Sequence, residues 1–384
     1  MPLPDGARFI LERLDAAGFE GFAVGGCVRD ALLGLQPKDY DICTNAQPQE
    51  MQRIFADCRV IETGLQHGTL TVLRDGEPYE VTTYRIDGDY ADHRHPDKVT
   101  FTRSLDADLA RRDFTVNAIA YNPRHGLIDL FEGQKDLQKK LIRCVGEAQR
   151  RFDEDALRIL RALRFAAVYG FAIEEETAQA AHLLKSTLKH VARERITVEL
   201  SKLLCGAGAQ EILLRHGAVI AEVLPAALHA EATAQAPAQL PIRLAHLLQD
   251  AQDVKAALGA LRLDNATAKA AMELIALKDR LEPENAVQWR KLLHETGQER
   301  TQQLAAWKQW NVQPLQDILA RGDCWNLKML AVTGKDLMAA GFAPGRGIGQ
   351  TLESLLLAVM EERVENQRAA LMDFAQRMRE KALC

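Results

Sequence analysis

The pattern of apolar and polar positions divides the chain into a first part, in which strands and helices alternate, and a long helical remainder. Residues 8–17 have apolar side chains at helical spacing, and this segment ends at Gly18. Asp75-Gly76 predicts a hairpin turn. Strands are predicted at 59–61, 69–73 and 80–85. Because strands and helices alternate through about residue 140, this part is predicted to be a small α/β domain.

From residue 152 onward, Ala, Leu, Glu, Lys and Arg recur at helical spacing. Helices are predicted at 154–168, 176–186, 193–205, 241–258, 265–281 and 351–380. The Ala-rich, proline-interrupted stretch 224–241 predicts a connection between domains. The predicted fold class is therefore α+β. Its expected divisions are an α/β head at 1–140, a helical part at 141–205 and a further helical part at 206–384.

Within the head, an apolar run ends abruptly in Gly25-Gly26, and a helix with Arg29 near its start is predicted to follow. Glycines permit close approach of the backbone, and a helix N-terminus attracts anions. Arg29 is therefore a candidate to hold a triphosphate. The alternatives are a plain tight turn and an ion pair of Arg29 with Asp30 or Glu20.

A pair of carboxylates, Asp39 and Asp41, follows this helix. Side chains two residues apart on a strand share a face, so both carboxylates are expected to reach one small volume. Mg²⁺ prefers such oxygen ligands and keeps positions open for phosphate oxygens. Two ions about 3.5–4 Å apart activate an attacking hydroxyl and stabilise a leaving pyrophosphate. Glu80 is a candidate third carboxylate, and a solvated strand position is the equally weighted alternative.

Two arginine-rich segments lie further along the chain. In 111–118, Arg111-Arg112 precedes Asp113 and suits contacts with phosphate and ribose, although a locally capped element has the same pattern. In 154–164, one acid and three arginines recur every three residues: Asp155, Arg158, Arg161 and Arg164. On an arbitrary helix these residues would form a solvated face with ion pairs.

A more specific interpretation assigns the second segment to base recognition. Cytosine and adenine both present an amino donor beside a ring-nitrogen acceptor, and Asp155 with Arg158 complements that pattern. Guanine and uracil present the reverse polarity, and a site that leaves polar groups unpaired discriminates by roughly 10⁴–10⁵. One pair of side chains would therefore select C and A without a template.

Composition adds few restrictions. The 384 residues predict two to three domains, and 47% hydrophobic with 26% charged residues is ordinary for a globular protein. The net charge is −5, but Lys and Arg cluster locally, which is sufficient for phosphate contacts. No signal peptide, membrane-length apolar run or CxxC pair is present, so we expect a cytoplasmic location and no membrane partner.

The motifs together resemble those of class II tRNA nucleotidyltransferases, the bacterial CCA-adding enzymes, which form one superfamily with bacterial poly(A) polymerases. The similar segments are GGCVRD with DYD, RRDFTVNA, EDALR, and RERITVELSKLL beginning at Arg193. The resemblance implies a nucleotidyltransferase head of the DNA polymerase β type, with a helical neck, body and tail that bind tRNA. It also implies template-independent addition of C, C and A from CTP and ATP, with Mg²⁺ as cofactor.

Family roles transfer to matching positions only. The resemblance implies that Gly26 and Arg29 contact the nucleotide, that Asp39 and Asp41 bind metal, and that Arg112 contacts the sugar-phosphate. Nucleotide-pocket roles also fall on Asp155 and Arg158, which read the base, and on Arg161 and Arg164, which support it. The family loop that switches the pocket from CTP to ATP corresponds to 85–98, whose full length favours retained A addition.

The C-terminal half is less informative. It has no adjacent His-Asp pair, so we expect no metal phosphohydrolase activity. Gly345 to Gly349 leads into a predicted helix and suits either a tRNA phosphate or a plain helix connection. Two alternatives to complete CCA addition stay open: an enzyme that adds only A to tRNA, and a poly(A) polymerase.

Overall fold

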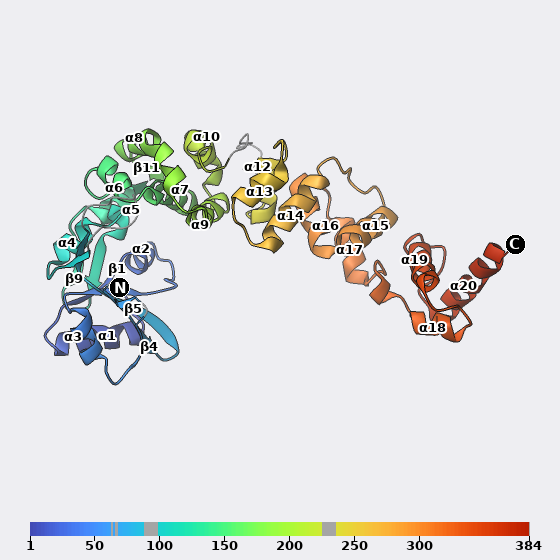
Figure 1. Cartoon of the computed structure of the whole chain (residues 1–384), viewed down its shortest axis with the longest axis horizontal. Helices are drawn as coiled ribbons and strands as arrows, with labels where there is room; N and C mark the ends of the chain where they lie inside the picture. Colours follow the sequence, from blue (N-terminus) through green and yellow to red (C-terminus); the bar gives the residue numbers. More distant parts are fainter. Residues whose placement is uncertain (63, 66–67, 88–98, 225–235, 384) are drawn as a thin grey trace. The chain divides into compact units, whose positions relative to one another are not determined.

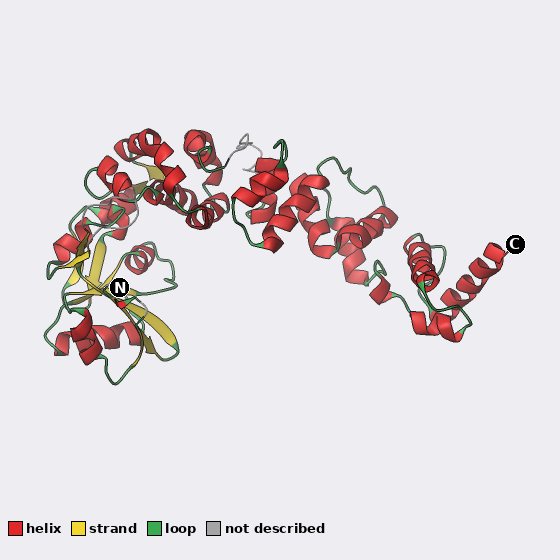
Figure 2. Ribbon diagram, viewed as in Figure 1, coloured by secondary structure: helices red, strands yellow, loops and turns green. Residues whose placement is uncertain are grey.

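The computed structural model describes residues 1–62, 64–65, 68–87, 99–224 and 236–383, which form two compact units. The first unit contains 1–240 and 250–264, and the second contains 241–249 and 265–384. The predicted connection 224–241 falls largely on 225–235, which lie outside the described residues. The α+β class is confirmed: Figure 2 shows strands confined to the N-terminal part of a mostly helical chain.

The first unit contains a mixed sheet with the strand order β3-β4-β5-β2-β1-β8-β9. Its strands are β1 (Gly21–Val24), β2 (Asp41–Thr44), β3 (Arg59–Ile61), β4 (Thr69–Arg74), β5 (Glu77–Thr83), β8 (Ile119–Asn122) and β9 (Gly126–Asp129). Only the β2–β5 pair within this sheet is parallel. The β4–β5 hairpin turns at Asp75-Gly76, both with positive φ, as their sequence predicts.

Helices cover this sheet and fix the positions of its ends. Helix α1 (Asp5–Ala16) contacts β1 and β5, α3 (Pro48–Ile54) contacts β4, and α2 (Gly26–Leu32) contacts β1 and β8. In the view of Figure 1, α1 and α3 lie together on one side of the strands and α2 on the other. Helix α4 (Leu105–Ala110) packs Leu105 and Leu109 into a buried cluster with Phe22, Val24 and Cys43. The burial of this cluster holds α4 firmly beside the central strands.

The rest of the first unit is mainly helical. It contains two small sheets, β6 (Arg85–Asp87) with β7 (Val99–Phe101) and β10 (Leu141–Ile142) with β11 (Ala172–Ile173). Its further helices are α5 (Gly133–Lys139), α6 (Ala148–Glu154), α7 (Leu157–Tyr169), α8 (Glu175–Leu184), α9 (Arg193–Leu204), α10 (Ala209–Ile220) and α13 (Val254–Ala260). Helix α7 packs against α9 and α10 and is buried along its apolar side. It provides a rigid support for the arginines that alternate with those apolar positions.

The second unit consists of helices. These are α12 (Leu240–Leu248), α14 (Asn265–Ala276), α15 (Ala286–Thr296), α16 (Gln298–Lys308), α17 (Gln313–Arg321), α18 (Gly334–Ala339), α19 (Arg346–Met360) and α20 (Arg368–Leu383). Near the C-terminus, Leu337, Leu355, Leu356 and Leu371 form a buried core. No helix among the described residues has the length and apolar character to cross a membrane.

Three predicted helices are each interrupted. The predicted helix 154–168 is divided between α6 and α7, 241–258 between α12 and α13, and 351–380 between α19 and α20. At the first break, Asp155 has φ −142° and ψ 103°, so it joins two helices rather than lying on one. The segment predicted to read the base therefore begins at a helix junction.

Candidate active site

The two predicted metal ligands lie at one end of the central strands. Asp41 is the first residue of β2 and pairs in register with Val24 of β1 and Glu80 of β5. Because side chains in register on adjacent strands point to the same face, Asp41 and Glu80 lie side by side. Asp39 precedes β2, so the prediction that both aspartates lie on the strand is wrong for Asp39. The turn after Val24 nevertheless lies beside this carboxylate cluster.

The carboxylates affect one another electrostatically. Asp41 keeps an exposed surface, yet surrounding protein removes part of its hydration, and Asp39 and Glu80 add negative charge. These effects raise the pKa of Asp41 to about 6, while Arg112 opposes them. The described residues contain no group of three or more His, Cys, Asp or Glu side chains arranged to hold a metal. A cation here would therefore take further oxygen ligands from a substrate, as Mg²⁺ commonly does.

The glycine turn lies between β1 and α2 and is flanked by two guanidinium groups. Gly25 has φ 77° and ψ −127°, a conformation that favours glycine. A Cβ on Gly25 would lie 3.3 Å from Nη1 of Arg112, and a Cβ on Gly26 would lie 3.5 Å from Nη2 of Arg29. The structure thus brings both predicted arginines to the turn. The guanidinium groups of Arg112 and Arg29 therefore face the backbone of Gly25 and Gly26 with no side chain between them.

We predict that Gly25→Ala both destabilises the protein and reduces nucleotide incorporation. The positive φ costs an L-residue about 1–3 kcal/mol, and the new Cβ would press on Arg112. Urea unfolding and incorporation assays measure the two effects. Gly34→Ala is the matched control, because Gly34 has φ 73° but no atom within 4 Å of the added Cβ. Equal loss of activity in both variants would contradict a local role for the turn.

Arg29 is more enclosed than the sequence indicates. Its Nε donates to Oδ1 of Asp30 at 2.8 Å, Nη2 lies 2.7 Å from the same oxygen, and Nη1 donates to Asn117 at 2.6 Å. Its guanidinium also lies over the rings of Phe165 and Tyr169. The alternative interpretation, an ion pair with Asp30, is therefore present in the structure. The nucleotide-contact role of Arg29 stays a prediction, and its surroundings connect α2 to α7.

The segment 111–117 forms a second set of charged contacts. Asp113 accepts hydrogen bonds from Phe114 N at 2.8 Å and Asn117 Nδ2 at 3.1 Å. It also accepts from Arg161 Nε at 2.9 Å and Nη2 at 2.6 Å. Burial raises the pKa of Asp113, but Arg161 and Asn117 outweigh burial and lower the pKa to about 2. Asp113 therefore serves as an ionised anchor for Arg161 as well as a local cap.

The predicted base-reading pair is positioned at the α6–α7 junction. Asp155 accepts from Leu157 N at 3.0 Å and from Arg195 Nη2 at 2.9 Å. Arg158 donates to Glu154 at 2.7 Å and to the carbonyl of Arg111 at 3.1 Å. The structure thus places Arg158 against the residue that precedes Arg112. Base reading by Asp155 and Arg158 stays a prediction, since both side chains have protein partners here.

Arg161 and Arg164 follow Arg158 along α7. Arg164 donates through Nε to Glu199 of α9 at 2.7 Å, and its guanidinium lies 3.6 Å from the centroid of the Phe165 ring. Arg161 reaches Glu199 at 3.7 Å and also lies over Phe165. Burial lowers the pKa of Arg164 although Glu199 opposes it. Both arginines are fixed in place, which suits a supporting role in a nucleotide pocket.

Several residues that connect these groups were missed from sequence. Asp108, Asn117, Tyr169, Arg195 and Glu199 each bond a predicted site residue or its neighbour, with Tyr169 donating to Asp30 at 2.9 Å. A detectable signal existed for Asp108, which lies three and four residues before Arg111 and Arg112. The others are distant in sequence, so their contacts depend on the fold.

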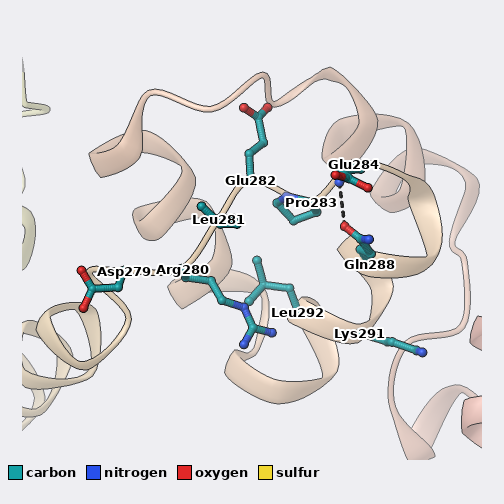
Figure 3. Close-up of a pocket in the computed structure, with 9 residues that line it drawn as sticks. All are labelled: Asp279, Arg280, Leu281, Glu282, Pro283, Glu284, Gln288, Lys291 and Leu292. Carbon is teal, nitrogen blue, oxygen red and sulfur yellow. Dashed lines mark hydrogen bonds between the residues drawn. The ribbon is translucent and has the colours of Figure 1, made fainter.

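A cavity of about 470 Å³ in the second unit has a different character (Figure 3). It is lined by the segment 279–284 and by Gln288, Lys291 and Leu292 of α15. Figure 3 shows Gln288 turned toward Glu284, whose backbone N–H donates to it at 2.8 Å. The cavity lacks the carboxylate cluster and glycine turn described above. We therefore do not assign the nucleotide site to this cavity.

Comparison with known proteins agrees with this arrangement. The family described as "Poly A polymerase head domain" matches residues 21–143, "Probable RNA and SrmB- binding site of polymerase A" matches 170–229, and "tRNA nucleotidyltransferase domain 2 putative" matches 228–375. The chain is 38% identical over 390 residues to the CCA-adding enzyme of Limosilactobacillus reuteri, which covers 96% of this chain and 95% of that protein. Over 197 residues it is 52% identical to the CCA-adding enzyme of Oceanobacillus iheyensis, covering 51% of this chain and 49% of that relative.

A solved structure shows the same fold. The Bacillus stearothermophilus CCA-adding enzyme in complex with CTP superposes with a TM-score of 0.83 at 34% identity, and 100% of both chains is covered. The likeness extends over the head and over the helices that follow it.

Proposed function

Because the chain belongs to the family of CCA-adding enzymes, we propose that it adds C, C and A to the 3′ end of tRNA, using CTP and ATP and no template. Full-length similarity to CCA-adding enzymes supports this function over poly(A) synthesis. The observation that carries the proposal is the position of Asp41, in register with Glu80 and beside a glycine turn flanked by Arg29 and Arg112. The proposal includes a cytoplasmic location, where tRNA and both nucleotides are available.

A divalent metal is typical of the family, and we propose Mg²⁺ held by Asp39 and Asp41. The residues fit such an ion, because their donors are carboxylate oxygens and because burial, together with the negative charges of Asp39 and Glu80, raises the pKa of Asp41. The bound metal would lower the pKa of the attacking hydroxyl and offset the charge on the leaving pyrophosphate. Glu80 is proposed as a third carboxylate that adds to the same negative field.

The protein's own groups bind and orient the substrates. The Gly25-Gly26 backbone admits the triphosphate closely, while the guanidinium of Arg112, and that of Arg29 beside Gly26, oppose its negative charge. The carboxylates of Asp39 and Asp41 lie next to this turn, so the α-phosphate and the tRNA 3′-hydroxyl would meet there. Holding the reacting atoms in line replaces a bimolecular encounter and supplies much of the rate enhancement.

Base choice is proposed to occur at the α6–α7 junction. Asp155 would accept the amino group of cytosine or adenine, and Arg158 would donate to the adjacent ring nitrogen. Arg161 and Arg164 would support the pocket from α7, where Asp113 and Glu199 hold them. Since each nucleotide presents the same pairing pattern to the same side chains, no nucleic-acid template is required.

The proposed function is tested with tRNA that lacks its 3′ end. The RNA is incubated with CTP alone, ATP alone or both, and the termini are sequenced. Two cytidines with CTP alone, and C-C-A with arrest when both are present, support the proposal. Addition of a single A only to tRNA that already ends in C-C would indicate an A-adding enzyme. A long A tail on unrelated RNAs would indicate a poly(A) polymerase.

A further inference from the structure

A buried carboxylate, that of Asp108, contacts both Arg111 and Arg112. Asp108 belongs to α4 and has no exposed surface. Leu105 and Leu109, on either side of it, pack into the core of the sheet with Phe22 and Val24. The position of Asp108 is therefore set by the same packing that holds β1, the strand that leads into the glycine turn.

Asp108 receives four hydrogen bonds. Its Oδ1 accepts from Nε and Nη2 of Arg111 at 3.0 and 2.8 Å and from the backbone N–H of Arg85 at 3.2 Å. Its Oδ2 accepts from Nη2 of Arg112 at 3.1 Å. Burial raises the pKa of Asp108, but Arg111 and Arg112 outweigh burial, so the pKa is lowered and the group is ionised at neutral pH. A buried ionised carboxylate with this many donors is a fixed reference point for both arginines.

Arg112 uses only one end of its guanidinium for this contact. Its Nη1 lies where a Cβ on Gly25 would be 3.3 Å away, on the side of the glycine turn. Its Nε is buried and has no hydrogen-bond partner in the described part of the chain. Because a guanidinium is planar, fixing Nη2 on Asp108 also fixes the direction of Nη1.

Two arginines of 141–205, the predicted neck, hold the backbone just before Arg112. Arg158 donates to the carbonyl of Arg111 at 3.1 Å, and Arg151 donates to the carbonyl of Ala110 at 3.3 Å. These carbonyls belong to the C-terminal end of α4, where helical partners are lacking and cations are favourable. The backbone beneath Arg112 is therefore held on one side while Asp108 holds its side chain on the other.

We propose that Asp108 is a positioning residue that aims the guanidinium of Arg112 at the triphosphate bound over the Gly25-Gly26 turn. This inference rests on the proposed function, since it assigns a role within the same nucleotide site. Asp108 contacts neither substrate in this scheme and acts only through Arg112. Without the negative charge of Asp108, the guanidinium of Arg112 would lose this fixed orientation and bind phosphate with a less favourable geometry.

The test compares Asp108→Asn, Arg112→Ala and the double variant. Asp108→Asn keeps the side-chain shape but puts an N–H₂ group or a neutral oxygen against the arginines. We expect KM for CTP and ATP to rise together at least about tenfold, with a smaller change in kcat, because a hydrogen bond to a charged group is lost. The double variant should resemble Arg112→Ala alone. Asp106→Asn, an exposed position on the same helix, is the matched control and should behave as wild type.

The outcomes separate the possible explanations. A lower melting temperature with unchanged KM, or effects that add in the double variant, would assign Asp108 a structural role and overturn the proposal. If Asp108→Asn does not fold, Arg112→Lys decides, because lysine keeps the charge but cannot bridge Asp108 and the turn. A normal KM in Arg112→Lys would then overturn the proposal. Wild-type protein that adds no C-C-A would instead refute the proposed function.

Discussion

Asp41→Asn should reduce the incorporation of both C and A by about 10³-fold or more while leaving tRNA binding nearly unchanged. The substitution keeps the size of the side chain and removes the charge that would hold the metal. Losing several kcal/mol of transition-state stabilisation corresponds to a rate loss of this size. Single-turnover incorporation of labelled CTP and ATP measures the rate, and a filter-binding assay measures the affinity for tRNA.

The same substitution should leave stability equal or slightly higher. The pKa of Asp41 is raised to about 6, so the folded protein favours the protonated carboxyl more than the unfolded chain does. Above this pKa, ionised Asp41 therefore opposes folding, mainly through lost hydration and repulsion by Asp39 and Glu80. A neutral amide relieves that cost at neutral pH. Urea unfolding at roughly pH 7.5 would detect the gain in stability, because Asp41 of the wild-type protein is ionised above its raised pKa.

Two further substitutions on β5 provide the comparison. Glu77→Gln is the matched control, because Glu77 is exposed on the same strand and pairs with Arg74 at the far end of the hairpin. Glu80→Gln distinguishes a third catalytic carboxylate from a solvated strand residue: a loss close to that of Asp41→Asn indicates the first, and wild-type rates indicate the second. Wild-type incorporation by Asp41→Asn would contradict metal binding at this position.

The strands and turns of the head were predictable because their signals are local. The segments at 59–61 and 69–73 became β3 and β4, and Asp75-Gly76 adopts the positive φ values that a tight hairpin needs. Gly25-Gly26 and Asp41 became candidates for a similar reason, since a strand that ends in glycines and a nearby acid pair is a local pattern. The position of Glu80 opposite Asp41 depends on the parallel pairing of β2 with β5, which no local pattern specifies.

The errors have common physical causes. Asp155 follows the end of α6 and its carboxylate accepts from Leu157 N at the start of α7, and Asp253 begins a helix by accepting from Ala256 N at 2.9 Å. Just after the C-cap of α19, Glu362 has φ 61°, a conformation more typical of glycine. Because helix-forming residues continue across each break, hydrophobic periodicity alone predicts one continuous helix where the structure has two. The proposed role of Asp108 was not predictable from sequence for a similar reason, because it depends on the burial of Asp108 and on its contacts with Arg111 and Arg112.

Replacing the base-reading pair by amides should relax base choice. We predict that Asp155→Asn with Arg158→Gln lowers the preference for C and A over G and U from roughly 10⁴-fold toward unity. Each amide can present either a donor or an acceptor, so neither pairing pattern leaves a buried group unpaired. Steady-state kcat/KM for each of the four nucleoside triphosphates on tRNA lacking its 3′ end measures this preference.

The ratio of specificities is the informative quantity, because the double variant also loses structural contacts. Asp155 loses its ion pair with Arg195, and Glu154 loses Arg158 although Arg151 still lies 2.8 Å away. Reduced stability would lower incorporation of all four nucleotides equally and cancel in the ratio. Arg150→Gln is the matched control, since Arg150 also pairs with Glu154 but is largely exposed, and its selectivity should match wild type. Unchanged discrimination in the double variant would place base choice elsewhere, and the arginines of α7 would then be the groups to substitute next.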